Sequence, residues 1–279
     1  DGVTLVELPG LDLYARESMA IPLYELRDPL ERREWISKLT GGFAEPWTFG
    51  QRVRDWLLAR ASDFDVVHDN QTLADGILDI QRSGIPVVTT IHHPITRDLR
   101  VALSEEPRWW RRLLIRRWHM FLSMQARVAS QLNHIVTVSQ FSAIDIATDF
   151  GVMPNAIKVV PNGVDTCLFR PLPAISRRPR QIIATASADA PLKGLATLLH
   201  AYKRLADADS SCELVLIARL RPGGDTEALI ERLDLQSRIR FVGDVSHEDI
   251  NRLYAESAVA VVPSLYEGFG LPAVEAMAA

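Results

Sequence analysis

The sequence predicts an α/β fold built from two domains, each with a parallel sheet. Short β-branched runs alternate with segments of helical periodicity along the whole chain. Several of these runs are almost continuously apolar, which is typical of parallel strands buried on both faces. The chain has 279 residues, more than one ordinary hydrophobic core contains, so two domains are expected.

Nine runs have the length and composition of strands, each bounded by polar or turn residues. Between them the spacing becomes helical: Leu195, Leu198, Leu199 and Tyr202 follow an i, i+3, i+4, i+7 pattern. Alternation on this scale predicts βαβ units, whose strands are parallel. The nine runs cover residues 3–8, 64–68, 86–92, 135–139 and 158–164, followed by 181–187, 213–219, 240–243 and 258–264.

A proline-rich, basic segment divides the two series of strands. Pro171, Pro173 and Pro179 interrupt both patterns, which is typical of a linker. The chain begins with Asp rather than Met and stops inside a helix-like run, so both sheets are expected to be truncated. We therefore expect a first domain at 1–172 without its opening elements, a linker at 173–180, and an incomplete second domain at 181–279.

The composition argues against several classes of function. A net charge of −4 provides no positive field for nucleic acid. Cys167 and Cys212 are the only cysteines and lie outside any CxxC or Cys/His cluster, so neither a disulfide framework nor a zinc site is expected. With no run of 18 apolar residues and no signal peptide, a cytoplasmic protein is expected.

The segment at 263–278 carries the strongest chemical signal. Gly268 and Gly270 occupy a turn between a strand and a helix, where the backbone can approach a ligand and free N–H groups attract phosphate. Glu267 precedes the turn and Glu275 follows it, and a carboxylate can accept two hydrogen bonds from a sugar diol. This arrangement suits a nucleotide-sugar. The alternative is an ordinary helix start, in which Glu275 only complements the helix dipole.

The same segment resembles the E-x7-E motif of the family 4 (group 1) glycosyltransferases, with Glu267 and Glu275 as the two glutamates. Further motifs of that family follow one another over nearly the whole chain. The set resembles a retaining glycosyltransferase of GT-B fold, in which two Rossmann-like parallel-sheet domains face a cleft. These motifs are a strand ending in histidine at 87–92, a strand and serine at 135–139, an NGVD segment at 162–165 and a strand at 241–243.

The resemblance implies a role for each part of the chain. The second domain would bind the nucleotide-diphosphate sugar and the first domain the acceptor. Glu275 would bind the ribose hydroxyls, and Glu267 would contact the donor sugar at the catalytic centre. No metal or other cofactor would be required, because basic side chains and helix dipoles meet the donor's charge. The backbone close to the donor would be that of Gly243, Gly268, Phe269, Gly270 and Leu271.

A lysine at the start of a helix would supply the positive charge that the donor's diphosphate requires. Lys193 would place a point charge on the leaving diphosphate. In the family an arginine precedes this lysine and also binds the diphosphate, but Ala188 stands at that position here. Arg219, at the end of the next strand, is the candidate substitute; without a substitute, activity would be weak or lost. The alternatives are an exposed loop lysine and a solvated arginine.

Histidines end two strands of the first domain. His92 is the candidate catalytic residue, since a histidine at a strand's carboxyl end can donate to developing charge or to the donor sugar. His93 points to the opposite face of the strand, so joint metal binding is not expected. His68 and Asn70 end another strand and are candidates for the acceptor side. A purely structural role for His92 is the alternative.

Residues 107–124 combine five arginines with three tryptophans. On a helical wheel Trp110, Leu114 and Phe121 share one face, opposite Arg108. Such a helix can lie on an anionic membrane, which would give a peripheral contact on the inner membrane face and would admit a lipid acceptor. Alternatively, the apolar face packs on the core. Nucleic acid is not expected, because no single-strand-binding fold accompanies the pattern.

The leading hypothesis is a retaining glycosyltransferase that moves a hexose from a nucleotide-diphosphate sugar to an unidentified lipid, metabolite or glycan. Two alternatives stay open. One is a GT-B nucleotide-sugar epimerase, against which the E-x7-E segment argues. The other is a non-catalytic nucleotide-sugar-binding or membrane-associated partner subunit, which Ala188 suggests.

Overall fold

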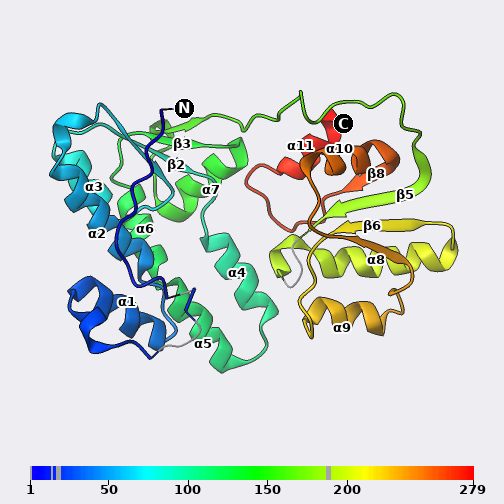
Figure 1. The fold of residues 1–279 in the computed structure, drawn as a ribbon, viewed down its shortest axis with the longest axis horizontal. Helices are drawn as coiled ribbons and strands as arrows, with labels where there is room; N and C mark the ends of the chain where they lie inside the picture. The colour runs from blue at the N-terminus through cyan, green and yellow to red at the C-terminus, as the bar shows by residue number, and fades with distance from the viewer. Residues whose placement is uncertain (1, 14, 17–19, 187–189) are drawn as a thin grey trace. The chain divides into compact units, whose positions relative to one another are not determined.

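The structure is a computed structural model that describes residues 2–13, 15–16, 20–186 and 190–279. The chain forms two compact units, Asp1–Pro161 and Asn162–Ala279, each of which contains one four-stranded parallel sheet (Figure 1). The two α/β units that the sequence predicts are therefore present.

In the first unit the strands pair in the order in which they occur along the chain, β1-β2-β3-β4. Helices from the crossovers pack with the sheet into one core, in which Leu73, Ile80, Ile91 and Ile146 are completely buried. The strands are β1 (Val67–Asn70), β2 (Val87–Ile91), β3 (Ile135–Thr137) and β4 (Ile157–Val159). The helices are α1 (Pro29–Leu39), α2 (Glu45–Leu58), α3 (Asp75–Arg82), α4 (Thr96–Glu105), α5 (Trp109–Trp118), α6 (Leu122–Ala129) and α7 (Gln140–Phe150). Short 3-10 turns are η1 (Leu23–Leu26), η2 (Ala61–Asp63), η3 (His119–Phe121) and η4 (Pro154–Ala156).

In the second unit the strand order is β7-β6-β5-β8. The chain moves outward from β5 to β6 and β7 and then returns to pair β8 with the other edge of β5. Right-handed crossovers in opposite directions place their helices on opposite faces. The strands are β5 (Arg178–Thr185), β6 (Glu213–Ile217), β7 (Ile239–Val242) and β8 (Ser257–Val261), and the helical elements are η5 (Pro191–Lys193), α8 (Leu195–Ala208), α9 (Asp225–Arg232), α10 (His247–Glu256) and α11 (Leu271–Ala278).

Both faces of this second sheet are covered, as Figure 1 shows, with α8 and α9 on one side and α10 and α11 on the other. Successive residues of a strand point to opposite faces. Accordingly, Ile183 packs in the cluster that contains Tyr254 of α10, whereas Ala184 packs in the cluster that contains Leu199 of α8 and Leu229 of α9. The near-continuous apolar runs of the sequence have this physical cause.

Eight of the nine predicted strand runs overlap an observed strand, and the prediction at 3–8 is wrong. Residues 3–8 have no regular secondary structure, and Val3 is 90% exposed. Alternating β-branched residues form a strand only when a neighbouring strand accepts their hydrogen bonds, and local composition does not report that partner.

The division between the units also differs from the expected one. Residues 162–172 were expected in the first domain, but they belong to the second unit. Phe169 is buried in the cluster of Ile183 and Tyr254, and the backbone of Arg170 exchanges two hydrogen bonds of 3.2 Å with the side chain of Asn251. The predicted linker at 173–180 is shortened by β5, which begins at Arg178.

We expect Gly76→Ala to destabilise the first unit. The helices α2 and α3 touch through two glycines, and a Cβ atom on Gly76 would lie 2.1 Å from the carbonyl oxygen of Gly50. Relief of such overpacking typically costs about 1–3 kcal/mol, or roughly 2–4 °C of melting temperature per kcal/mol for a unit of this size. Thermal unfolding measures the change. Gly163→Ala is the control, because a Cβ there meets nothing within 4 Å; equal melting temperatures for the two variants would contradict the prediction.

Candidate functional site

The strand order of the second unit reverses between β5 and β8. At such a switch point the loops after the two strands lead to opposite faces and leave a crevice at the carboxyl ends, where open α/β sheets bind ligands. The loop after β5 leads through η5 to α8, and the loop after β8 leads to α11. The predicted donor residues Lys193, Glu267 and Gly268–Leu271 lie in these two loops or, in the case of Leu271, at the start of α11.

The two loops are fixed to each other by their backbones. The amide of Leu265 donates to the carbonyl of Leu192 at 2.8 Å. Gly194 has a φ of +63°, and a Cβ atom there would lie 2.0 Å from the carbonyl oxygen of Pro263. Only glycine fits this combination of left-handed backbone and close approach. The loops therefore meet at a defined separation.

One ion pair joins the loops through their side chains. The Nζ of Lys193 lies 2.8 Å from Oε1 of Glu267, and the hydroxyl of Ser264 donates to the same oxygen at 2.7 Å. Both charged side chains remain partly exposed. A pair of this kind adds little stability, but it orients the ammonium group and the carboxylate at the switch point. The structure thus brings together two of the residues that the sequence singled out.

Glu275 lies in α11, eight residues after Glu267, and points into a different environment. Burial raises the pKa of Glu275, an effect that His247 partly offsets by lowering it. Within the described residues no hydrogen bond or ion pair satisfies this carboxylate. A helix dipole would lower the pKa of an acid at the helix start, and Glu275 is in any case the fifth residue of α11 rather than part of its first turn. The dipole alternative therefore does not account for this residue.

The glycine turn between the two glutamates has the geometry that its sequence predicts. Gly270 has a φ of +84° and caps the N-terminus of α11. Pro272 lies in the first turn of that helix, where no backbone N–H is needed. Phe269 and Gly270 are half-buried, so the backbone from Gly268 to Leu271 borders the switch point.

The other predicted donor residues lie in the loops after β6 and β7. Arg219 follows β6 and is 81% exposed, and it forms an ion pair with Asp244 after β7. Gly243 follows β7 and is also exposed. Arg219 therefore bonds to Asp244, whereas Glu267 bonds to Lys193, and the two cations do not share a carboxylate. Ala188, the position of the departure from the family pattern, lies outside the described residues.

In the first unit His92 follows β2 and is held from several sides. Its Nε2 lies 2.8 Å from Oδ1 of Asn70. The side chain of Gln71 accepts from the amide of His92 at 2.7 Å, and Ser142 donates to the carbonyl of His92 at 2.9 Å. An Asn70 oxygen that accepts from Nε2 leaves Nδ1 of the neutral ring as an acceptor.

The two other histidines near the carboxyl ends of β1 and β2 have separate partners. Nε2 of His68 lies 2.8 Å from the hydroxyl of Thr90, and Nε2 of His93 lies 3.1 Å from Asp98. His92 and His93 follow β2, which ends at Ile91, and their rings bond to different partners. Among the described residues no group of three His, Cys, Asp or Glu side chains is placed to hold a metal ion.

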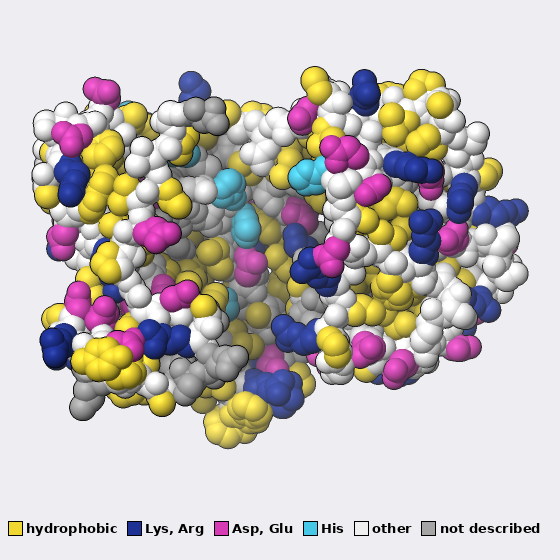
Figure 2. Space-filling view, in the orientation of Figure 1, with side chains coloured by type: hydrophobic (Ala, Val, Ile, Leu, Met, Phe, Trp, Pro, Cys, Tyr) yellow, Lys and Arg dark blue, Asp and Glu magenta, His cyan; other side chains and the backbone are white. Residues whose placement is uncertain are grey.

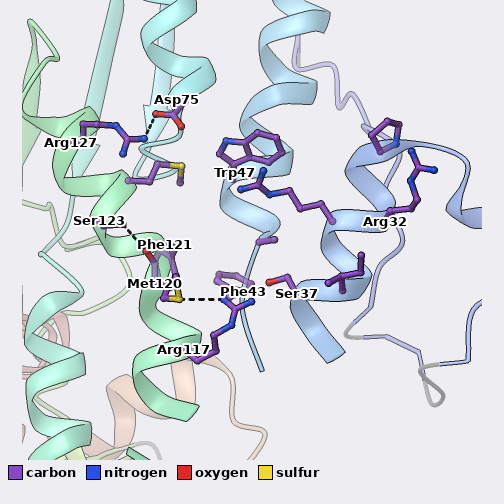
Figure 3. Close-up of a pocket in the computed structure, with 15 residues that line it drawn as sticks. Arg32, Ser37, Phe43, Trp47, Asp75, Arg117, Met120, Phe121, Ser123 and Arg127 are labelled. Atoms are coloured by element: carbon purple, nitrogen blue, oxygen red, sulfur yellow. Dashed lines mark hydrogen bonds and ion pairs between the residues drawn. The ribbon is translucent and has the colours of Figure 1, made fainter. Parts of the chain in front are cut away.

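Two cavities open in this unit, and the smaller one lies beside the predicted residue Asn70. One, of about 480 Å³, is lined by Asn70 and Gln71 together with Trp118 and Gln125, which the sequence did not single out. The other, of about 650 Å³, is lined by arginines (Figure 3). There Arg127 pairs with Asp75 at 2.7 Å, and the guanidinium of Arg33 lies 3.7 Å from the ring centre of Trp47. Neither cavity is encoded by a local motif, because each lining combines segments far apart in the sequence.

The predicted helix at 107–124 is not continuous. The chain forms α5, then the 3-10 turn η3, then α6. Phe121 and Met124 are buried, but no residue of α5 is, and Trp109 is 73% exposed. The core-packed alternative required Trp110 and Leu114 to be buried and is wrong for both. Among the described residues, none of the helices has the length and hydropathy that a membrane span requires.

Comparison with known proteins gives relatives over the whole chain. The chain is 48% identical over 278 residues to an MMP alpha-(1->4)-mannosyltransferase of Mycolicibacterium hassiacum, which covers 99% of this chain and 67% of that protein. It is 28% identical over 236 residues to a phosphatidyl-myo-inositol mannosyltransferase of Mycolicibacterium smegmatis, covering 82% of this chain and 54% of the relative. The chain thus spans two thirds of the first relative and about half of the second.

Solved structures share the fold. The HepE protein of Anabaena in complex with UDP superposes with a TM-score of 0.59 at 22% identity, over 80% of this chain and 60% of that one. A sucrose-phosphate synthase of Thermosynechococcus elongatus gives a TM-score of 0.58 at 22% identity, over 82% and 57%. The GT-B fold expected from the resemblance is confirmed at the level of the two sheets.

Family profiles match both units. Residues 12–167 match glycosyltransferase family 4, and residues 174–279 match glycosyl transferases group 1. The chain therefore belongs to the group 1 (family 4) glycosyltransferases of GT-B fold.

Proposed function

We propose that the protein transfers a hexose from a nucleotide-diphosphate sugar to an acceptor hydroxyl with retention of the anomeric configuration. The observation that carries this proposal is the ion pair of Lys193 and Glu267 at the switch point of the second sheet. Mannose is the proposed sugar, because the relative that is 48% identical is named as a mannosyltransferase.

The donor is proposed to bind at the carboxyl ends of β5 and β8. A diphosphate would draw Lys193 from Glu267 and would receive N–H groups from the adjacent helix starts. Glu267, then released from the ion pair but still held by Ser264, would accept from a hydroxyl of the sugar. Glu275 would accept from the ribose diol, which would supply the partner that its half-buried carboxylate lacks.

In the chemical step the bond between the anomeric carbon and the diphosphate breaks, and the acceptor oxygen bonds to that carbon on the same face. The acceptor's proton leaves with the diphosphate or passes to solvent. Positive charge at Lys193 stabilises the leaving group, which is the main task of the protein in this scheme. In the other unit, His92 is proposed to be a catalytic residue that donates to developing charge or to the donor sugar, and Asn70 and His68 are proposed to lie on the acceptor side.

Turnover with a panel of GDP-, UDP- and ADP-sugars tests this proposal and its alternatives. A glycosidic product whose anomeric configuration, read by NMR coupling constants, matches that of the donor supports retaining transfer. An epimerised donor without a glycosidic product would indicate an epimerase. Donor binding without any turnover would indicate a partner subunit. We further propose that no metal is required, so turnover should survive EDTA.

We expect Lys193→Ala to reduce kcat/KM for the donor by about 10²–10³, because removal of one key charge donor costs about 2.7–4 kcal/mol of transition-state stabilisation. The fold should persist, since the pair with Glu267 is partly exposed. Steady-state kinetics provides the measurement. Lys203→Ala, which removes an exposed pair with Asp207 on α8, is the matched control. Equal kcat/KM for the two variants would refute a role for Lys193.

We expect Glu275→Gln to stabilise the free protein at pH 7–8 while weakening donor binding. The raised pKa means that Glu275 favours folding below its unfolded pKa of about 4.3 and loses that contribution as pH rises through its folded pKa. The variant's gain in melting temperature should therefore shrink at low pH. The rise in melting temperature that a nucleotide-sugar produces should also be smaller for this variant than for wild type. Glu248→Gln, at an exposed position of α10, is the control; a stabilised variant with an unchanged donor shift would rule out the ribose role.

We also propose that α5 makes a peripheral contact with an anionic membrane. Trp109, Trp110 and Leu113 are exposed on this helix. Hydrophobic side chains and a basic cluster protrude together at the lower edge of Figure 2, where Figure 1 places the start of α5. Arg108 and Arg111 both reach Glu106, and hydrogen bonds from Arg108 hold the pKa of that carboxyl at about 2.

Co-sedimentation with phosphatidylserine-containing vesicles tests this contact. Binding should appear at low salt and fade as salt screens an attraction of about 1 kcal/mol per basic residue near the surface. Replacing both Trp109 and Trp110 by Ala should abolish it without lowering the melting temperature. Phe141→Ala, at an exposed aromatic of α7, should leave binding intact. A wild-type protein that stays in the supernatant at low salt would end the membrane proposal.

A further inference from the structure

The cavity of about 480 Å³ in the first unit lies beside the proposed acceptor residues. Asn70, whose side chain holds Nε2 of His92, is part of its lining. The lining joins the start of α2, the carboxyl end of β1, the end of α5 and α6. A molecule bound in this cavity would therefore lie next to the Asn70–His92 pair.

Aromatic rings form one wall of the cavity. The rings of Phe43 and Trp118 stack with centroids 4.9 Å apart and an interplanar angle of 10°. Phe121 meets both edge-on, at 5.4 Å and 5.5 Å. These contacts fix the indole, and Trp118 nonetheless remains partly exposed. A rigid, partly exposed aromatic surface suits a ligand with an apolar C–H face, such as one side of a pyranose ring.

Two oxygens in the lining lack partners. The Nε2 of Gln125 donates to the carbonyls of Gln71 and Thr72, both at 3.3 Å, which fixes the orientation of the amide. Its Oε1 is buried and, among the described residues, has no hydrogen-bond partner, although Gln125 is only 2% exposed. Oε1 of Glu45 is likewise buried and has no hydrogen-bond partner among the described residues. A buried acceptor without a donor costs stability, so both oxygens are suited to hydroxyl groups of a ligand.

The charge of the cavity restricts that ligand further. Its lining contains the carboxyl group of Glu45 and no lysine or arginine. Burial raises the pKa of Glu45, and the neighbouring Lys38, which does not line the cavity, offsets this only in part. The arginines of this region line the other cavity (Figure 3). A phosphorylated ligand would thus meet repulsion here and attraction next door, whereas a neutral polyol would meet neither.

We infer that this cavity is an acceptor subsite and that the acceptor is a neutral glycan rather than a phosphorylated alcohol. A sugar ring stacks on Trp118 and donates hydroxyl hydrogens to Glu45 and Gln125. This inference rests on the proposed transferase function, and it adds the class of the acceptor.

One substitution is expected to change the acceptor KM in opposite directions for the two classes of acceptor. Glu45→Gln keeps the shape of the side chain but removes its charge. With a neutral mannose disaccharide as acceptor, we expect the acceptor KM to rise about tenfold, since hydrogen bonds to an ionised group are roughly twice as strong as neutral ones. With inositol phosphate as acceptor, loss of repulsion would instead lower KM. Trp118→Leu should raise the disaccharide KM at least tenfold in the same assay.

Matched controls and a donor-only measurement complete the test. Phe141→Leu and Glu105→Gln alter an exposed phenylalanine and an exposed glutamate outside the cavity, and both should leave the acceptor KM unchanged. Donor binding, followed by the thermal shift with nucleotide-sugar alone, should be unaffected in all four variants. If wild type shows no donor shift, the proposed function fails. If the donor shift is normal but Glu45→Gln and Trp118→Leu use the disaccharide like wild type, or wild type uses inositol phosphate with a lower KM than the disaccharide, the neutral-glycan subsite is overturned.

Discussion

The reversal of strand order between β5 and β8 is the constraint on which the donor site depends. Because β8 pairs with the opposite edge of β5 from β6, the loops after β5 and β8 leave the same sheet edge toward opposite faces. Gly194 then allows these loops to touch at Pro263, and the contact sets the distance over which Lys193 reaches Glu267. Without this topology the two residues, 74 positions apart, would have no reason to meet.

The turn at the proposed donor site could be predicted from the sequence because its signals are local. Gly268, Gly270 and Pro272 describe a strand-to-helix turn without reference to the rest of the chain, and the two glutamates have a fixed spacing around it. The run at 3–8 has an equally clear local pattern, yet it forms no strand, since a strand requires a partner that composition does not report. Local signals are sufficient for turns and helix starts and insufficient for sheet edges.

The acceptor-side cavity shows the converse limit. Gln71 orients His92 with a backbone φ of +62°, a conformation that nothing in its neighbours predicts. Glu45, Trp118 and Gln125 become neighbours only after α2, α5 and α6 have packed. The 3-10 turn η3 has a similar effect: by interrupting the helix it separates buried Phe121 from exposed α5, so a single helical wheel misassigned the apolar face.

Each unit contains polar groups that burial leaves poorly satisfied. Burial raises the pKa of Glu275 in one unit and of Glu45 in the other, and Oε1 of Glu45 and of Gln125 is buried without a hydrogen-bond partner among the described residues. Each such group lowers the stability of the free protein, and folding alone gives no reason to retain it. A ligand that donates hydrogen bonds removes that cost, so binding and stability become coupled at each position. The cavity of about 650 Å³ differs, because Arg127 there is paired with Asp75 and Arg33 lies over the ring of Trp47. These two cations therefore need no ligand. Unmet hydrogen-bond capacity, more than cavity volume, therefore distinguishes the smaller cavity as the one suited to a sugar.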